Sequence, residues 1–81
     1  MIESSQIKAA RAMLDWSQQV LAEKSGVSLP TIKRIENAGP GRSSLDTINA
    51  IMAALEAAGV EFIPENGGGP GVRLRKSGAP T

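Results

Sequence analysis

The chain has 81 residues, a net charge of +1, and neither cysteine nor histidine. Without these residue types it lacks disulfides, the usual zinc ligands and histidine-based catalysis, so we expect neither an enzyme nor a metal or other cofactor. A chain this short buries only about 60 to 65% of its unfolded surface, so a partner subunit would aid stability. The longest apolar run, residues 50–55, is too short to span a membrane, and the polar N-terminus does not resemble a secretion signal. We therefore expect a cytoplasmic protein without a membrane partner.

The first predicted helix covers residues 5–14. Its apolar residues recur with the period of an α-helix, and they are Ile7, Ala10, Met13 and Leu14. The spacing gives the helix one apolar face, which we expect to pack over the helices that follow.

Two further helix starts and a glycine turn follow within residues 17–37. Ser17 and Ser28 are each placed to cap a helix, because a serine hydroxyl accepts a backbone N–H that the first turn leaves unpaired. Gly26 lies between them, where the first of these helices must end and the chain must turn. This layout, with a basic second helix, is typical of the DNA-binding helix-turn-helix.

A fourth helix is predicted after the loop at residues 38–41. Ser43 or Ser44 can cap its start, and Gly59 ends it. Its expected apolar face consists of Leu45, Ile48, Ile51, Met52 and Leu55.

The tail beyond Gly59 changes to the period of a β-strand. We expect a hairpin with a long glycine-rich loop over residues 64–71 and a frayed end over residues 77–81. The expected pairs across the hairpin are Val60 with Leu74, Phe62 with Val72, and Glu61 with Arg73. Such an apolar face needs cover, either from the fourth helix or from a second subunit by face packing or strand exchange. We expect the second, and assign dimerisation to Val60, Phe62, Val72 and Leu74. In a third option, a basic arm of Arg73, Arg75 and Lys76 reaches DNA.

Residues 7–59 resemble a known family, and the resemblance rests on LDWSQQVLAEKSGVSLPTIKRIENAG followed by SLDTINAIMAAL. These runs are similar to the Cro/cI-repressor-like helix-turn-helix domain, also called the XRE family. The resemblance implies a mainly α, four-helix, lambda-repressor-like domain over residues 1–59. The tail, residues 60–81, departs from the family pattern and is expected to be a dimerisation extension of β-strands, as a hairpin or as exchanged strands. The resemblance also implies an ion pair between Arg11 and Glu36 that ties the first helix to the third.

The second helix of the motif presents its N-terminal residues to base edges in this architecture. The candidate base-reading residues are Leu29, Pro30, Thr31, Lys33 and Arg34. Leu29 and Pro30 can contact a thymine methyl group, whereas Arg34 can donate two hydrogen bonds to guanine. There are simpler interpretations of two of these residues. Pro30 can be a first-turn proline that costs no hydrogen bond, and Arg34 can be a solvated surface arginine.

Phosphate contacts require only charge or a free donor. The candidates are Ser17, Gln18, Ser28, Asn37, Arg42 and Ser43. Ser17 and Gln18 open a helix whose N-terminal dipole favours an anion, and the family resemblance implies a phosphate there. Asn37 can alternatively cap the end of its helix.

We therefore predict a sequence-specific regulator of transcription that binds double-stranded DNA, most simply a homodimeric repressor on a palindromic operator. The closest alternative is an antitoxin that binds DNA with its helix-turn-helix and a toxin partner with its tail. RNA binding is less favoured, because the only aromatic residues, Trp16 and Phe62, are better explained as core.

Overall fold

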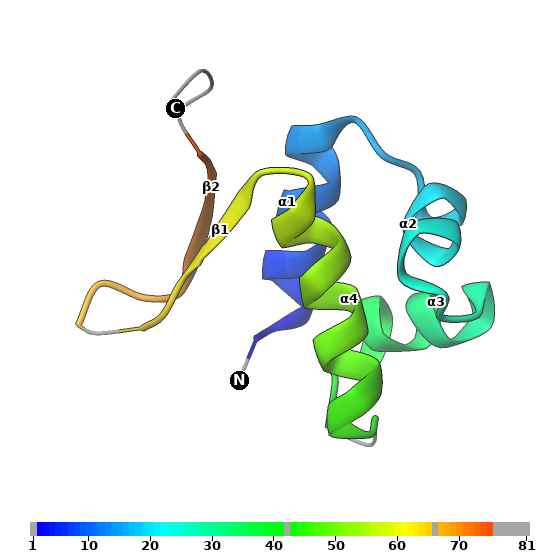
Figure 1. Ribbon diagram of the computed structural model, residues 1–81. Coiled ribbons are helices and arrows are strands. Elements are labelled where there is room, and N and C mark those ends of the chain that lie inside the picture. Colours follow the sequence, from blue (N-terminus) through cyan, green and yellow to red (C-terminus); the bar gives the residue numbers. More distant parts are fainter. Residues whose placement is uncertain (1, 42, 66, 76–81) are drawn as a thin grey trace.

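Four helices are followed by a two-stranded antiparallel hairpin in the computed structural model, which describes residues 2–41, 43–65 and 67–75 (Figure 1). The elements are α1 (Ser4–Leu14), α2 (Gln18–Ser25), α3 (Leu29–Ala38), α4 (Leu45–Ala57), β1 (Val60–Ile63) and β2 (Gly71–Leu74). This confirms the predicted mainly α class with a hairpin after the helices. The predictions for Arg42, for Lys76 and for a frayed end at residues 77–81 fall outside the described residues.

Serine caps begin three of the helices. The Oγ atom of Ser17 accepts the backbone N–H of Val20 at 3.1 Å, and that of Ser28 accepts the N–H of Thr31 at 3.4 Å. Of the two serines considered for α4, Ser44 is the cap, and its Oγ atom accepts from the N–H of Thr47 at 3.1 Å. These hydroxyls satisfy donors that the first helical turn leaves unpaired, so each helix begins one residue after its serine.

The turn between α2 and α3 depends on a glycine, as predicted. Gly26 has φ of +74°, and its N–H donates to the carbonyl oxygen of Ala22 at 2.9 Å to close the end of α2. A residue with a Cβ adopts this left-handed conformation only at a cost. The glycine therefore sets the sharp change of direction between the two helices.

The start of α1 has a cap that we did not predict. Glu3 precedes the helix, and its backbone N–H donates to Oε1 of Gln6 at 2.8 Å. The Nε2 atom of Gln6 donates in turn to the carbonyl oxygen of Gly71 at 3.0 Å, which ties α1 to β2. Gln6 is buried, and both of its contacts explain why a polar side chain lies there.

The core lies where the four helices and β1 meet. Its members are buried apolar residues from every helix and from the first strand, namely Ile2, Ile7, Ala10, Leu21, Ala22, Ile32, Ile35, Ile48, Ile51, Leu55 and Val60. Two residues expected on apolar helix faces are wrong: Met13 of α1 is 41% exposed, and Leu45 is 67% exposed. Leu45 is the first residue of α4, where it lines a surface groove instead of facing the other helices. No helix in the described ranges is long and apolar enough to cross a membrane.

The hairpin has the predicted register, with Val60 opposite Leu74, Glu61 opposite Arg73 and Phe62 opposite Val72. Its apolar face folds back on the chain's own helices, with β1 against α4 and β2 against α1 (Figure 1). Val60 is fully buried, and Phe62 and Val72 pack against the core. The fourth helix and α1 thus supply the cover for which we expected a second subunit.

A further contact joins the end of β2 to the end of α4. The backbone N–H of Arg75 donates to the carbonyl oxygen of Gly59, and its guanidinium donates to the carbonyl oxygen of Glu56, both at 2.6 Å. A cation at a helix C-terminus is favourable because the last carbonyls are unpaired and the helix dipole is negative there. Arg75 therefore closes α4 and anchors the hairpin.

Candidate nucleic-acid interface

A buried ion pair holds α3 against α1. Arg11 donates from Nε to Oε2 of Glu36 and from Nη2 to Oε1, each at 2.7 Å, so the pair expected between these residues is present in bidentate form. The Glu36 side chain is only 2% exposed. A third donor of the guanidinium, Nη1, bonds the carbonyl oxygen of Trp16 at 3.0 Å, which includes the α1–α2 connection in the network.

The network raises the pKa of Arg11 above its ordinary value, chiefly through the hydrogen bonds to Glu36 and further through the charge of Glu36, against the opposing effect of burial. Because the shift is upward, the contribution of the Arg11 charge is lost only when the pH rises through this raised pKa, far above neutrality. Arg11 therefore keeps its charge at neutral and moderately alkaline pH.

Gln18, a candidate phosphate contact, belongs to the same network. Its Nε2 atom donates to Oε1 of Glu36 at 3.1 Å, so the first residue of α2 is linked to the last turns of α3. The amide nitrogen carries a second N–H that this bond does not use. The contact fixes the N-terminus of α2 relative to α3, which sequence reasoning did not anticipate.

The start of α3 is capped by hydroxyl contacts and is partly apolar. Ser28 caps the helix and also donates from Oγ to Oγ1 of Thr31 at 2.9 Å, so these two hydroxyls engage each other. Pro30 lies in the first turn, where its missing N–H costs nothing, and it is exposed. Leu29 is half-buried and packs against the core, so only part of its side chain faces outward.

The exposed face of α3 carries four of the candidates in one stripe. Pro30, Lys33, Arg34 and Asn37 are exposed at helical spacing, while Ile32, Ile35 and Glu36 are buried on the opposite face. We call these four exposed residues the α3 stripe. Its two charges are both positive. The stripe therefore combines an apolar contact, two cations and an amide on one helix face.

The α3–α4 loop lies beside this stripe. The Nη2 atom of Arg34, which is exposed, donates to Oγ of the half-buried Ser43 at 3.4 Å, a weak contact between two candidates. Asn37 does not cap α3, because the helix continues to Ala38 and Gly39 takes the C-cap position, with its N–H on the carbonyl oxygen of Ile35 at 2.8 Å. The alternative interpretation of Asn37 as a C-cap is therefore wrong.

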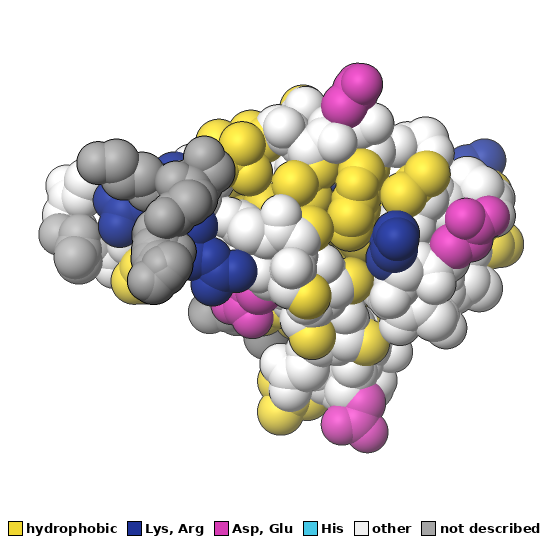
Figure 2. Space-filling model, turned by 45° about the horizontal axis from the view of Figure 1, so that its top comes forward, with side chains coloured by type: hydrophobic (Ala, Val, Ile, Leu, Met, Phe, Trp, Pro, Cys, Tyr) yellow, Lys and Arg dark blue, Asp and Glu magenta, His cyan; other side chains and the backbone are white. Residues whose placement is uncertain are grey.

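The arginines of the hairpin are separate from this surface. Arg73 pairs with Glu61 at 2.7 Å, and Arg75 bonds the end of α4. Figure 1 shows the hairpin on the opposite side of α1 and α4 from α2 and α3. In Figure 2, mostly hydrophobic and uncharged surface separates the Lys and Arg side chains on the hairpin side, at the left, from the other basic side chains of this face.

The four residues assigned to dimerisation are not equally accessible. Val60 is 1% exposed and belongs to the chain's own core, and Phe62 and Val72 pack against that core. Leu74 alone among them is exposed, at 45%. In this arrangement a second subunit would meet Leu74 and the outer edges of the strands rather than the apolar face of the hairpin.

Comparison with known proteins agrees with this geometry. A family model described as helix-turn-helix, of the XRE type, matches residues 7–62, from within α1 to within β1. A search of curated proteins gives no match to the chain.

Proposed function

The chain belongs to the XRE family of helix-turn-helix proteins, a family of DNA-binding regulators of transcription, and from this we propose that it is a homodimeric repressor on a palindromic operator. The observation that carries the proposal is the α3 stripe, a basic, exposed helix face on a rigid framework. The buried pair of Arg11 and Glu36 fixes α3 relative to α1, so the face can enter the major groove without rearrangement.

The residues of the α3 stripe divide between base and phosphate contacts. Arg34 has the planar fork of donors that suits guanine O6 and N7, and Pro30 offers an apolar contact for a thymine methyl group. Lys33 adds a cation that either a base edge or a phosphate can accept. Asn37, near the end of the helix, is a donor for the backbone beyond the base contacts.

The N-terminus of α2 is proposed to bind a phosphate on the other side of the groove. Ser17 and Gln18 lie where backbone N–H groups and the helix dipole favour an anion. Because Gln18 also bonds Glu36, a phosphate there would be linked directly to the position of α3. Arg42 and Ser43 follow α3 in the sequence and are proposed to contact DNA phosphates on the other flank of the groove. Ser28, at the start of α3, is also proposed to contact a phosphate.

A dimer is proposed because one recognition helix reads few base pairs. Two copies related by a twofold axis would meet half-sites about one turn of DNA apart, which multiplies specificity. Leu74 is the exposed apolar residue of the hairpin for this contact. Repression is the simplest outcome, since an occupied operator blocks access to the DNA that it covers.

Selection of DNA from a random pool tests the proposal. The wild-type chain should enrich a palindrome with half-sites about one turn apart, as a twofold dimer requires. Lys8→Ala, which removes an exposed cation from α1, should enrich the same site. Recovery of a single asymmetric half-site would contradict the dimer, and no enrichment at all would contradict sequence-specific DNA binding.

A further inference from the structure

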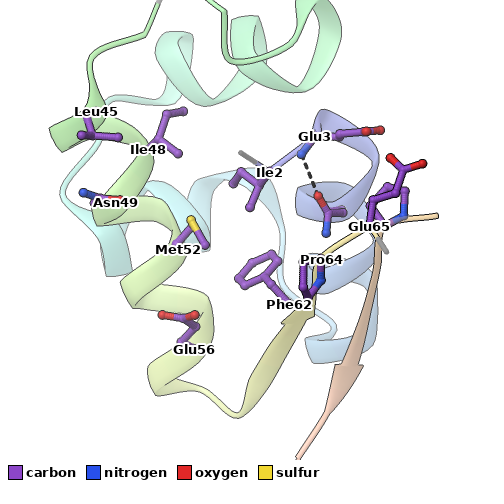
Figure 3. A pocket seen from close by; sticks show the side chains of 12 residues that line it. Ile2, Glu3, Leu45, Ile48, Asn49, Met52, Glu56, Phe62, Pro64 and Glu65 are labelled. Atoms are coloured by element: carbon purple, nitrogen blue, oxygen red, sulfur yellow. Dashed lines mark hydrogen bonds between the residues drawn. The ribbon is translucent and has the colours of Figure 1, made fainter. Parts of the chain in front are cut away.

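A groove lies on the side of α4 that faces the hairpin (Figure 3). It has a volume of about 790 Å³ and lies between α4, the start of α1, and the segment from β1 to Pro70. Its floor is apolar, with Met52 and Leu45 on α4, Ile2 before α1, and the ring of Phe62 opposite them. Leu45 is 67% exposed, the highest value among the exposed large hydrophobic residues of the described chain.

The rim of this groove is acidic. Glu56 on α4, Glu3 before α1 and Glu65 after β1 line it, and all three are exposed. Among the described residues that line the groove, none is Lys or Arg. The chain as a whole carries a net charge of +1, so the concentration of carboxylates here is local. An apolar floor with a carboxylate rim is complementary to an occupant that is apolar and cationic.

We propose that the groove is a docking site for a lysine- or arginine-rich amphipathic segment of a partner protein. Its apolar side chains lie over Met52 and Phe62 and cover Leu45, and its cations face Glu56 and Glu65. A helix or an extended segment with basic residues flanking large apolar ones has this chemistry. DNA is a poor occupant, because the same carboxylates repel phosphates.

A second copy of the chain fits less well. A twofold contact brings the same patch of both subunits together, so this groove would place carboxylates against carboxylates. The α3 stripe does not line the groove, so the groove and the proposed base contacts use different residues. The inference does not depend on the proposed repressor function, but it supplies the kind of partner that the antitoxin alternative requires.

Selection from a displayed library of random dodecapeptides tests the proposal with the full-length protein. Peptides enriched on the wild type should combine at least two Lys or Arg residues with large apolar residues. A synthetic copy of the most enriched peptide should lose at least about tenfold in affinity on Glu56→Lys and on Leu45→Ala, measured by calorimetry. The matched control Glu23→Lys makes the same change at an exposed position on α2, outside the groove, and should alter the affinity less than about twofold.

Three outcomes would overturn the proposal. The first is that the selection enriches no peptide, or enriches peptides without basic residues. The second is that Glu23→Lys and Glu56→Lys weaken binding of the synthetic peptide equally. The third is that the wild type self-associates in sedimentation and Leu45→Ala converts it to a monomer. The last would assign the groove to a second copy. Circular dichroism of each variant verifies that it is folded. DNA affinity of Glu56→Lys should stay within about twofold of wild type, so failure of this proposal and failure of DNA binding are separate results.

Discussion

Removal of Glu36 tests the framework that holds α3. The carboxylate is 2% exposed and accepts three hydrogen bonds, two from Arg11 at 2.7 Å and one from Gln18 at 3.1 Å. Glu36→Ala leaves the guanidinium of Arg11 with the carbonyl oxygen of Trp16 as its remaining partner and with 19% of its side chain exposed. Breaking a buried pair costs about 3 to 5 kcal/mol, and the partial exposure of Arg11 reduces our expectation to about 2 to 4 kcal/mol.

That loss is large for a small domain. A chain of this length has a free energy of unfolding of roughly 4 to 12 kcal/mol. With a urea m value of about 1 to 1.5 kcal/mol per M, a loss of about 3 kcal/mol lowers the midpoint by about 2 to 3 M. This shift of the midpoint is measured by a urea titration in which circular dichroism monitors unfolding. The difference from wild type should be constant from about pH 7 to 11, because the pKa of Arg11 is raised above its ordinary value and Arg11 stays charged over this range.

The chain contains its own control for this experiment. Arg73 and Glu61 form an ion pair with the same N–O distance of 2.7 Å, but their side chains are 68% and 38% exposed. Glu61→Ala should therefore cost no more than about 1 kcal/mol, since solvent screens an exposed pair. A loss below about 1 kcal/mol for Glu36→Ala, or an equal loss for Glu61→Ala, would refute the argument that burial makes the first pair important.

Three further changes have distinct expected results. Gln18→Ala should weaken binding to all DNA sequences alike in a titration, and it should also lower the urea midpoint, because the Gln18 amide bonds Glu36. Loss of discrimination at one base position would contradict the phosphate assignment. Gly26→Ala should cost about 1 kcal/mol in the same urea titration through backbone strain alone, since φ is +74° and no atom lies within 4 Å of the added Cβ; an unchanged midpoint would contradict it. Truncation after Gly59 removes the buried Val60 and the rest of the hairpin, and should give a less stable helical monomer with weak DNA binding. If light scattering shows that the truncated chain is a dimer at micromolar concentration, the interface lies in the helices.

Local signals in the sequence determined what could be predicted. Ser17 and Ser28 mark helix starts because a cap acts within one turn, and Gly26 marks the turn because its conformation is a property of one residue. The hairpin register followed from alternation on both sides of a loop. These features need no knowledge of the rest of the chain.

Contacts between distant residues were not predictable in the same way. Gln6 bonds Gly71, which is 65 residues further along the chain, and periodicity carries no information about such a pair. Leu45 is exposed at the first position of α4, although its spacing in the helix is that of a core residue. The pair of Arg11 and Glu36 was expected from the family resemblance, whereas the contact of Gln18 with Glu36 was not.

The central claim is that the exposed face of α3 reads DNA sequence, and Arg34 tests it most directly. Fluorescence anisotropy at one salt concentration would compare wild type, Arg34→Ala and the control Lys8→Ala on the selected operator and on variants with each base pair changed in turn. We predict that Arg34→Ala loses about 1 to 3 kcal/mol on the operator and no longer discriminates at one position of each half-site, while Lys8→Ala behaves as wild type. A uniform loss of affinity across all variants, with discrimination kept at every position, would contradict the account.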